Sequence, residues 1–310
     1  MKGTVVKSTG SWYEVKTEEG QLLHARLKGK FRIKGIKSTN PVAVGDKVLL
    51  EKEGEEALIT EIQERKNYII RRSINLSRQV QIIAANIDQL FLIVTIKKPF
   101  TTKGFVDRVL VGAEAYRIPV VLLFNKIDLL NEKDLNDLQS WVETYKLAGY
   151  DSLKISVLEN IGLDEVKELM KDKVSMLTGN SGVGKSALIN ALDPGLELKI
   201  GKISDYHQSG MHTTTFAEMF EFSFGGKIID TPGVKGFGNV EIEKTELSHY
   251  FPEMRQRMQD CKFNNCIHMN EPECAVKAAV ENGEIPLSRY NNYLYMLEED
   301  STETFRGKGY

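Results

Sequence analysis

Hydrophobic and polar positions alternate with different periods along this chain, and the periods divide it into three zones. In residues 1–68, stretches such as GTVVKS, WYEVKT, LLHARL and DKVLLEK alternate apolar and polar positions, and glycines punctuate them about every ten residues. A period of two is typical of β-strands with one buried face. This zone predicts a small antiparallel barrel or sandwich, and five strands in this length fit an OB-type barrel.

Residues 69–238 change to alternating strands and helices. The apolar runs QLFLIVTI and VVLLF have the length of buried strands, and LKIS (153–156), VSMLTG and GKIID predict further strands. Repeated strand–helix units predict a mostly parallel sheet with helices on both faces. The apolar helix faces that we expect are Phe105, Val109, Ala113 and Tyr116; Leu135, Leu138, Val142 and Tyr145; and Leu163, Val166 and Met170.

Residues 239–310 read as helical and polar. The whole chain of 310 residues is 41% hydrophobic and 27% charged, with a net charge of −2, which is ordinary for a water-soluble globular protein. Its first residues lack the apolar core of a signal peptide, and its apolar runs are of strand length. We expect a cytoplasmic, monomeric protein of three domains (1–68, 69–238 and 239–310) without membrane partners.

The segment GNSGVGKS matches the phosphate-binding P-loop pattern in full, and it lies between a predicted strand and the predicted helix SALINAL. Its glycines let backbone N–H groups surround phosphates. Lys185 is expected to reach the β and γ phosphates and to act in catalysis, and the hydroxyl of Ser186 is expected to bind Mg²⁺. The nucleotide-contacting residues predicted here are Gly179, Asn180, Ser181, Gly182, Val183, Gly184, Lys185 and Ser186.

Two further segments complete a nucleoside-triphosphate site. Asp230 closes GKIID and opens DTPG, where it is placed to hold the metal through water while the N–H of Gly233 meets the γ-phosphate. Between the P-loop and DTPG lies GMHTTT, and one of its hydroxyls is expected to complete the Mg²⁺ shell. We assign this role to Thr214. The alternative is that these β-branched residues only begin a strand.

The segment FNKIDL (124–129) predicts recognition of guanine. Guanine offers two adjacent donors, N1–H and the 2-amino group, and the carboxylate of Asp128 can accept both, whereas adenine offers neither. Asn125 can meet the other edge of the base, and the stem of Lys126 can pack over the nucleotide. Ser156, at the end of LKIS, is a further and weaker candidate for a base contact.

The order of these segments is rotated relative to a conventional GTPase. The conventional order is phosphate loop, threonine switch, DxxG, NKxD and serine loop, whereas this chain begins with NKID and the serine loop. In an open parallel sheet the ligand lies at the carboxyl ends of the strands, so a site depends on which strands are neighbours. A cyclic rotation preserves those neighbours. The chain is therefore predicted to be a circular permutant.

All 3 cysteines lie between positions 261 and 274, in the pattern C-x₄-C-x-H-x₅-C. A reducing compartment disfavours disulfides. Three thiolates and one imidazole make a closed tetrahedral zinc site with a structural role, and zinc would hold together a region whose apolar content is thin. Buried cysteines without a metal are the alternative. The expected ligands of one zinc ion are Cys261, Cys266, His268 and Cys274.

On NKID, GNSGVGKS, GMHTTT, DTPG and the cysteine cluster, the chain closely resembles the RsgA (YjeQ) family of circularly permuted bacterial GTPases, over essentially its whole length. The resemblance implies an OB-like barrel, a permuted GTPase core and a zinc-binding domain. It also implies a GTPase that binds the small ribosomal subunit, is stimulated by it and acts late in its maturation. Met211 departs from the family pattern, which usually has a basic residue there, and this puts a contact to RNA or phosphate in doubt.

The catalytic water needs an orienting group, which Ras-like enzymes supply as a glutamine just after DxxG. Val234 stands in that place and can neither donate nor accept a hydrogen bond. His212, beside the switch threonines, is the best substitute, and the family resemblance points to it as well. A structural histidine is the alternative. Without a positioned glutamine, we predict slow intrinsic hydrolysis that accelerates on the partner.

A basic strip follows the third predicted strand. In ARLKGKFRIKGIK the cations recur every second residue, which in a strand places them on one face. A cationic face of an OB-type barrel suits the backbone of rRNA, and a merely solvated strand face is the alternative. The predicted RNA-binding residues are Arg26, Lys28, Lys30, Arg32 and Lys34.

Two other functions stay open at this point. A P-loop alone permits an ATP-dependent kinase or transport ATPase, although NKID argues against it. An RNA-binding assembly protein with a switch-like but weakly catalytic GTP site is the second alternative. A further hypothesis concerns coupling, because DTPGVKGFG leads directly into the cysteine-containing zone. Nucleotide-driven movement of that segment is expected to act on the zinc domain.

Overall fold

The computed structural model describes residues 1–28, 41–54, 56–72, 80–196, 217–230 and 242–299. The chain forms two compact units that interleave along the sequence. The first unit comprises Met1–Leu90, Asp164–Leu177 and Ser186–Val234, and the second comprises Phe91–Leu163, Thr178–Lys185 and Lys235–Tyr310. The predicted domain boundaries after residues 68 and 238 stay predictions.

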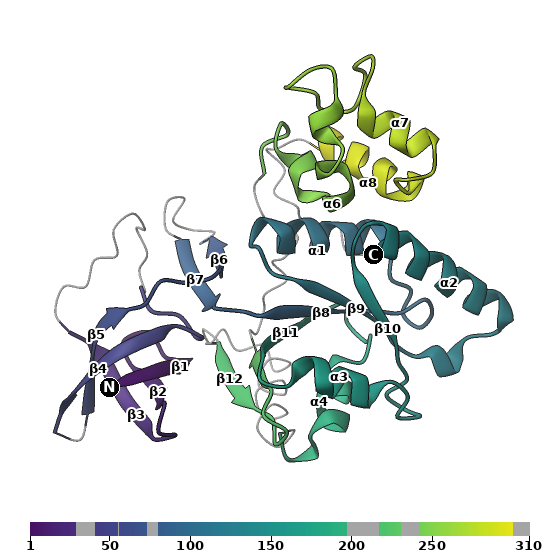
Figure 1. The fold of residues 1–310 in the computed structure, drawn as a ribbon. Helices are drawn as coiled ribbons and strands as arrows, with labels where there is room; N and C mark the ends of the chain where they lie inside the picture. The colour runs from purple at the N-terminus through teal and green to yellow at the C-terminus, as the bar shows by residue number, and fades with distance from the viewer. Residues whose placement is uncertain (29–40, 55, 73–79, 197–216, 231–241, 300–310) are drawn as a thin grey trace. The chain divides into compact units, whose positions relative to one another are not determined.

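The N-terminal part of the first unit is the predicted closed barrel of five strands (Figure 1). Four strand pairs are antiparallel, and β3 pairs with β5 in parallel, which closes the barrel. This parallel pair departs from the antiparallel barrel that we expected. The reason is that β4 pairs with β1, so the β4–β5 hairpin returns β5 beside β3 in the same direction. The strands are β1 (Lys2–Ser8), β2 (Tyr13–Thr17), β3 (Leu22–Leu27), β4 (Lys47–Glu53) and β5 (Glu56–Ile62).

Alternating side chains of these strands fill the barrel, as their period-two pattern predicts. The burial pattern of β2, for example, alternates between buried and partly buried residues. The barrel core consists of Val5, Tyr13, Val15, Leu23, Ala25, Val42, Val48, Leu50, Ala57 and Ile59.

Among the described residues, the rest of the first unit carries further strands and the helices α3 and α4. In one sheet, β11 pairs with β13 in parallel, and β13 pairs with β12 in antiparallel fashion. β12 then pairs with β1 through Glu218 and Lys7, so this sheet continues into the barrel. The elements are the hairpin β6 (Tyr68–Arg72) and β7 (Val80–Ala85), α3 (Leu163–Met170), β11 (Val174–Thr178), α4 (Lys185–Leu192), β12 (Glu218–Glu221) and β13 (Lys227–Asp230).

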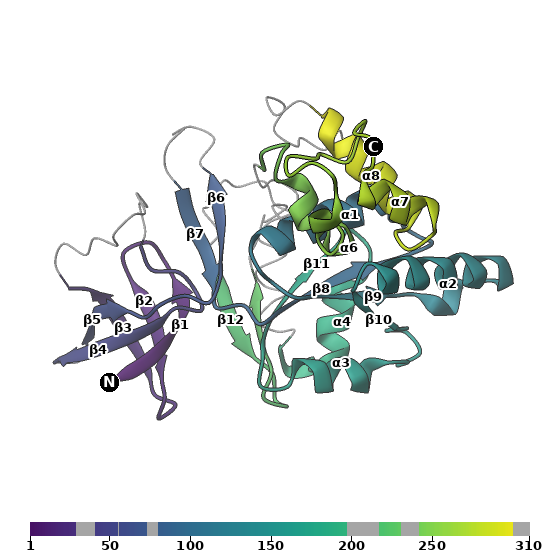
Figure 2. The ribbon, with the colours of Figure 1, turned by 45° about the horizontal axis from the view of Figure 1, so that its top comes forward.

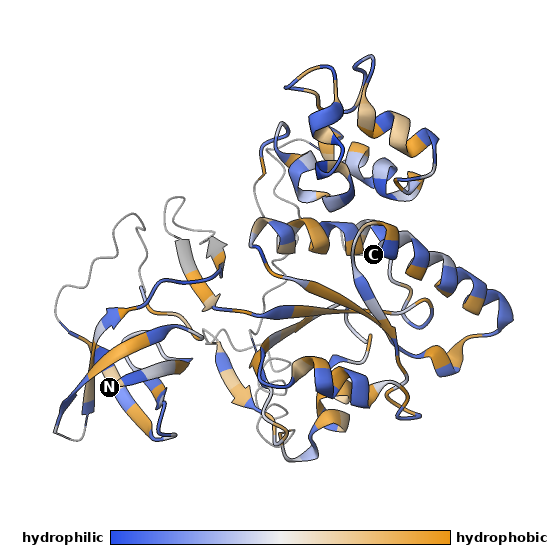
Figure 3. Ribbon diagram, viewed as in Figure 1, coloured by the Kyte–Doolittle hydropathy of each residue, from blue (hydrophilic) through white to orange (hydrophobic). Residues whose placement is uncertain are grey.

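The second unit contains the strand order β10-β9-β8, and β9 pairs with β10 in parallel. β8 (Gln89–Val94) begins in the first unit and is buried along its whole length, and Figure 3 shows it as hydrophobic over almost all of that length. β9 spans Val120–Phe124 and β10 spans Asp151–Lys154. The predicted strand at 153–156 therefore lies two residues earlier, because Ser156 already takes part in an isolated bridge with Ile161.

Two capped helices follow β8 and β9. α1 (Lys103–Ala115) begins where the side chain of Thr102 accepts a hydrogen bond from the Phe105 N–H. α2 (Glu132–Leu147) begins with a capping box. The prediction that Leu135 lies on the buried face of α2 is wrong, because its side chain is 47% exposed. The buried residues of α2 are Leu138, Trp141, Thr144 and Tyr145.

The C-terminal part of the second unit is helical, as predicted, and lies beside α1 (Figures 1 and 2). Its elements are η3 (Leu247–Tyr250), α6 (Pro252–Arg255), η4 (Met258–Asp260), α7 (Ala275–Glu281) and α8 (Leu287–Glu298). The expectation of a thin apolar content is wrong. A core of Leu247, Phe251, Met254, Cys266, Cys274, Val276, Ala279, Ile285, Tyr293, Met296 and Leu297 packs together with Val111 of α1.

In the part of the chain that the structure describes, no helix has the length and apolar character that crossing a lipid bilayer requires.

Candidate nucleotide site and metal centre

The NKID segment leaves the end of β9 in a tight turn. Asn125 follows Phe124 directly, and its backbone N–H donates a hydrogen bond of 2.9 Å to the carbonyl of Val94 at the end of β8. Lys126 has left-handed backbone geometry, with φ of 66°, and precedes the 3₁₀ turn η1 (Ile127–Leu129). The turn brings three polar side chains of NKID to the carboxyl ends of the strands, where ligands bind in sheets of this kind.

Two side chains of NKID contact the phosphate loop directly. The amide of Asn125 donates to the carbonyl of Val183 over 2.9 Å, and the ammonium of Lys126 donates to the carbonyl of Gly182 over 2.7 Å. The same ammonium donates to the carbonyl of Lys98 over 2.6 Å. The segments that sequence reasoning assigned to the base and to the phosphates are therefore joined within one unit.

Asp128 and Ser156 also meet. The hydroxyl of Ser156 donates to a carboxylate oxygen of Asp128 over 2.5 Å, and it accepts a hydrogen bond of 3.1 Å from the Glu159 N–H. The Val157 N–H donates to the side-chain oxygen of Asn125 over 3.3 Å. These contacts orient the Asp128 carboxylate and the Asn125 amide from the following loop, which places the serine loop beside NKID as the motif order predicts.

The phosphate loop requires glycine at specific positions. Gly179 and Gly184 have φ of 147° and 104°, values that the backbone of residues with a side chain rarely adopts. A Cβ atom at Gly184 would lie 2.5 Å from the amide nitrogen of Asn125, and one at Gly179 would lie 2.6 Å from the carbonyl oxygen of Ile93. At both positions a Cβ atom would therefore force a neighbouring group to shift.

Lys185 points back into the phosphate loop. Its ammonium donates to the carbonyls of Gly179 over 2.8 Å and Asn180 over 2.7 Å. Burial lowers the pKa of Lys185, because the charged form loses contact with water. A phosphate bound in the loop would give this ammonium a negatively charged partner.

The other residues predicted for the nucleotide site lie in the first unit or outside the described residues. Ser186 in α4 and Asp230 at the end of β13 belong to the first unit. His212, Thr214 and Gly233 lie outside the described residues.

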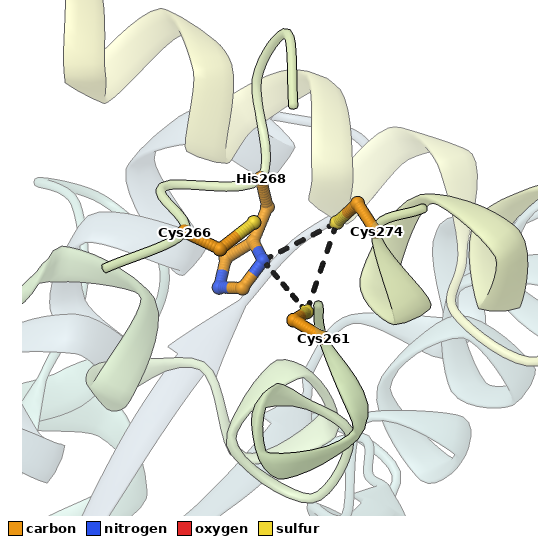
Figure 4. A group of neighbouring side chains, drawn as sticks. All are labelled: Cys261, Cys266, His268 and Cys274. Atoms are coloured by element: carbon orange, nitrogen blue, oxygen red, sulfur yellow. Dashed lines mark hydrogen bonds between the residues drawn. The ribbon is translucent and has the colours of Figure 1, made fainter. Parts of the chain in front are cut away.

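Four side chains of the C-terminal region converge as a candidate metal centre (Figure 4). The ligand atoms of Cys261, Cys266, His268 and Cys274 all lie within 4.8 Å of one another. Nδ1 of His268 lies 3.6 Å from the sulfur of Cys261 and 3.4 Å from that of Cys274, and the two sulfurs are 3.9 Å apart. The arrangement brings together the full set of residues predicted as ligands, and it could hold a metal ion.

These separations fit a tetrahedral ion. With metal–sulfur bonds of about 2.3 Å and a metal–nitrogen bond of about 2.0 Å, a tetrahedron places two sulfurs about 3.8 Å apart and a sulfur and a nitrogen about 3.5 Å apart. Burial lowers the pKa of His268, so its imidazole is neutral and able to coordinate. The separations of 3.6 and 3.4 Å from Nδ1 to the sulfurs of Cys261 and Cys274 indicate Nδ1 as the ligand atom of His268. Its Nε2 is buried without a hydrogen-bond partner among the described residues.

Three side chains that sequence reasoning missed hold the metal-binding loop in place. The Glu271 carboxylate accepts hydrogen bonds from the backbone N–H groups of Ile267, Met269 and Asn270. From α8, the Tyr290 hydroxyl donates to the carbonyl of His268 over 2.7 Å, and the Tyr293 hydroxyl donates to that of Ile267 over 2.5 Å. The only sequence signal for the tyrosines is their spacing of three residues on one helix face.

The basic strip is only partly described. Arg26 pairs with Glu53 and Glu56, and Lys28 pairs with Glu51, so acids on β4 and β5 oppose both cations. All these side chains are exposed, which makes the pairs weak. Lys30, Arg32 and Lys34 lie outside the described residues. The role of the strip in binding RNA stays a prediction.

Two family models match the chain. The model described as "RsgA GTPase" matches residues 62–240, and the model described as "RsgA N-terminal domain" matches residues 2–59. Among curated relatives, the small ribosomal subunit biogenesis GTPase RsgA of Flavobacterium johnsoniae is 58% identical over 304 residues, which cover 97% of this chain and 94% of the relative. The protein of the same name from Bacteroides fragilis is 54% identical and covers 99% of both chains.

Solved structures agree in fold. The crystal structure of YjeQ from Thermotoga maritima superposes with a TM-score of 0.79 and 38% identity, covering 96% of each chain. The structure of YloQ, described as a circularly permuted GTPase, superposes with a TM-score of 0.75 and 31% identity, covering 96% of this chain and 93% of YloQ. The permutation predicted from the motif order is thus the architecture of the solved relatives, and the prediction is confirmed.

Proposed function

Because this chain belongs to the RsgA GTPase family, we propose that it hydrolyses GTP to GDP in the late maturation of the small ribosomal subunit. The observation that carries the nucleotide part of the proposal is the double hydrogen bond from Asn125 and Lys126 to the phosphate loop. A nucleotide, with a base at one end and phosphates at the other, would use both segments at once.

In this proposal the base and the phosphates are held by separate groups. Asp128, oriented by Ser156, accepts hydrogen bonds from N1–H and the 2-amino group of guanine, and the stem of Lys126 packs over the nucleotide. The backbone N–H groups of residues 179–186 surround the phosphates, and Lys185 exchanges its two carbonyl acceptors for phosphate oxygens. Lys185 then stabilises the charge that develops on the transferred phosphoryl group.

We propose Ser186 and Thr214 as ligands of the Mg²⁺ that accompanies GTP, with Asp230 holding it through water and Gly233 meeting the γ-phosphate. When bound, the metal neutralises charge between the β and γ phosphates. His212 is the proposed group that orients the attacking water.

We assign zinc to the cluster of Cys261, Cys266, His268 and Cys274, one ion for each chain. The donor set of three sulfurs and one nitrogen at tetrahedral spacing supports zinc. The ion has a structural role in this proposal, because four protein ligands leave no open position for a substrate.

The relatives' name supports the small ribosomal subunit as the partner that stimulates hydrolysis. Contact with rRNA through the basic strip, a monomeric state and a cytoplasmic location complete the proposal. The alternative is an RNA-binding assembly protein with a weakly catalytic GTP site.

GTP turnover with and without purified small ribosomal subunits tests the proposal. We expect slow turnover by the protein alone and at least a tenfold increase with subunits, since a bound partner can complete the catalytic site. The Lys185→Ala variant is the control for contaminating GTPases and is expected to abolish the increase. Equal competition by ATP and GTP for the site would contradict guanine recognition. Fast turnover without subunits would contradict stimulation by the partner.

A further inference from the structure

A fully buried arginine joins the C-terminal helices to α1 within the second unit. The guanidinium of Arg289, on α8, donates to the carboxylate of Asp107 on α1 over 2.7 Å. It also donates to both carboxylate oxygens of Glu253 on α6, over 2.7 and 3.2 Å. The side chains of Arg289 and Asp107 are each 1% exposed, so three charges meet where water has no access.

Further donors satisfy the excess negative charge of this cluster. The Tyr145 hydroxyl of α2 donates to Asp107 over 3.0 Å, and the Asn292 amide of α8 donates to its other oxygen. The guanidinium carbon of Arg289 lies 4.6 Å from the centre of the Phe251 ring. Burial alone would lower the pKa of Arg289, but the charges of Asp107 and Glu253 outweigh it and raise the pKa. A network satisfied in this way admits one arrangement of α1, α6 and α8.

The same helix α8 holds the metal-binding loop. Tyr290 and Tyr293, one and four residues after Arg289, donate their hydroxyl hydrogens to the carbonyls of His268 and Ile267. The position of the loop that carries a metal ligand and the position of Arg289 are therefore set by one rigid element.

The other end of the connection reaches the nucleotide site. α1 begins directly after a turn in which the Thr101 N–H donates to the carbonyl of Thr95, and the Thr101 hydroxyl accepts from the Thr95 N–H. Within that turn, the carbonyl of Lys98 accepts the ammonium of Lys126, which also donates to Gly182 of the phosphate loop. A shift of α1 moves this turn and with it an acceptor that holds Lys126 in place.

We propose that α8 and α1 couple the metal centre to the nucleotide site, with Arg289 as the positioning residue at their junction. Metal in the cluster fixes the loop 261–274, the loop fixes α8, and the buried network fixes α1 and the turn that contacts Lys126. A nucleotide site that is already ordered loses less entropy on binding, so metal occupancy raises the affinity for guanine nucleotide. This inference rests on the proposed function, and its route differs from the segment after DTPG, of which 231–241 lies outside the described residues.

Coupling between two binding sites is reciprocal, so it can be measured as a change in affinity at either site. The dissociation constant of GDP is determined by fluorescence titration for the zinc-loaded full-length protein and for protein stripped with a chelator. We expect the stripped protein to bind GDP about fivefold more weakly or worse. Zinc affinity in the presence of saturating GDP is then expected to rise by the same factor. Identical GDP affinity of the two forms would overturn the coupling.

Two variants test whether the coupling runs through the buried network. In zinc-loaded protein, Arg289→Met and Tyr290→Phe are each expected to weaken GDP binding and to reduce the difference between the loaded and stripped forms. Tyr290→Phe removes one hydroxyl only, so it serves as the test if Arg289→Met does not fold. Arg255→Gln is the matched control. Arg255 also reaches α1, where it pairs with Glu114, but the Arg255 side chain is 52% exposed and loss of this pair is expected to change GDP binding by less than about twofold.

The outcomes separate this inference from the proposed function. If the wild-type protein does not bind GDP, the proposed function fails. If it binds GDP and the Tyr290→Phe variant keeps the full difference between the loaded and stripped forms, only the coupling through α8 fails. An equal effect of Arg255→Gln would also contradict the assignment to the buried network, since any contact to α1 would then act in the same way.

Discussion

The ammonium of Lys126 lies 2.7 Å from the carbonyl oxygen of Gly182, although Lys126 precedes Gly182 by 56 positions in the chain. In a GTPase of conventional order the phosphate loop comes first. The contact forms in either order, because both loops leave the carboxyl ends of strands in a sheet whose neighbours are the same. A rotation of the chain moves the termini and leaves such contacts in place.

Asp128→Asn is expected to change the base preference of the nucleotide site from guanine to xanthine. The amide keeps one acceptor oxygen but presents donors where guanine also presents donors, so GDP affinity is expected to fall by about 2 kcal/mol, roughly thirtyfold. Xanthine has a carbonyl in place of the 2-amino group and can accept from the new amide. Titration of the variant with GDP and with xanthosine diphosphate measures both changes. The oxygen that accepts from Ser156 is retained, so thermal stability is the control and is expected to stay the same.

Gly184→Ala is expected to damage the phosphate loop more than Gly182→Ala. Both positions have positive φ, which costs alanine about 1 kcal/mol. At Gly184 the added Cβ also meets the amide nitrogen of Asn125 at 2.5 Å and must break its hydrogen bond to Val183, whereas the nearest atom at Gly182 is 3.7 Å away. Isothermal titration with GDP is expected to show roughly tenfold weaker binding by Gly184→Ala than by Gly182→Ala. Equal losses would show that the clash relaxes without consequence.

Metal uptake is expected to release protons and to weaken at low pH. Burial raises the pKa of Cys266 to about 12, and it also raises that of Cys274. Both thiols are therefore protonated near neutral pH without metal, and a metal ion that binds thiolates must displace about two protons from them. Below the thiol pKa values, the apparent zinc affinity should therefore rise at least about 100-fold for each unit by which the pH increases. A competition titration with a zinc-binding dye at several pH values measures this slope.

The stability of the metal-free protein is expected to fall as the pH rises, whereas its zinc affinity rises. The pKa of Cys266 is raised in the folded chain, so its contribution to stability is complete below the ordinary thiol value of 9.0. That contribution is lost as the pH rises from there through about 12. Thermal unfolding of stripped protein should therefore shift to lower temperature above about pH 9, while zinc-loaded protein changes less because its thiolates are already bound. A shift of equal size in both forms would contradict this explanation.

Asp46→Ala is expected to destabilise the barrel by about 3–5 kcal/mol. Its carboxylate is fully buried and accepts two hydrogen bonds of 2.6 Å from Arg65 and one of 2.8 Å from the Ala43 N–H. Removal leaves the Arg65 charge buried without its partner, which is costly. Arg26→Gln in the exposed pair with Glu53 is the matched control and is expected to cost less than about 1 kcal/mol. Urea unfolding of the full-length variants measures both.

Much of the fold and site could be predicted because each feature is local in sequence. The barrel strands follow from alternation, and the P-loop, NKID and the cysteine cluster follow from fixed spacings of residue types with particular chemistry. Leu135 shows where this reasoning ends. Its spacing placed it on the buried face of α2, but it lies in the first turn of the helix and is exposed.

The connection between the C-terminal region and the GTPase core could not be predicted, because it depends on residues far apart in the chain. Asp107 and Arg289 are 182 positions apart, and each alone reads as a charged residue on the solvent side of a helix. Asp46 and Arg65 are only 19 positions apart, but they lie outside the barrel strands, so the alternation of those strands does not indicate their buried pair. Pairing of buried charges is decided by tertiary packing, which no periodicity records.

The rotated order also has a consequence for synthesis. Ribosomes add roughly 5–20 residues per second, so the 56 positions between Lys126 and Gly182 separate their emergence from the exit tunnel by about 3–11 s. During that interval the NKID segment has been synthesised and the phosphate loop has not. The contacts of Asn125 and Lys126 to the phosphate loop can therefore form only after the second segment has been synthesised, and a nucleotide that needs both segments cannot bind earlier.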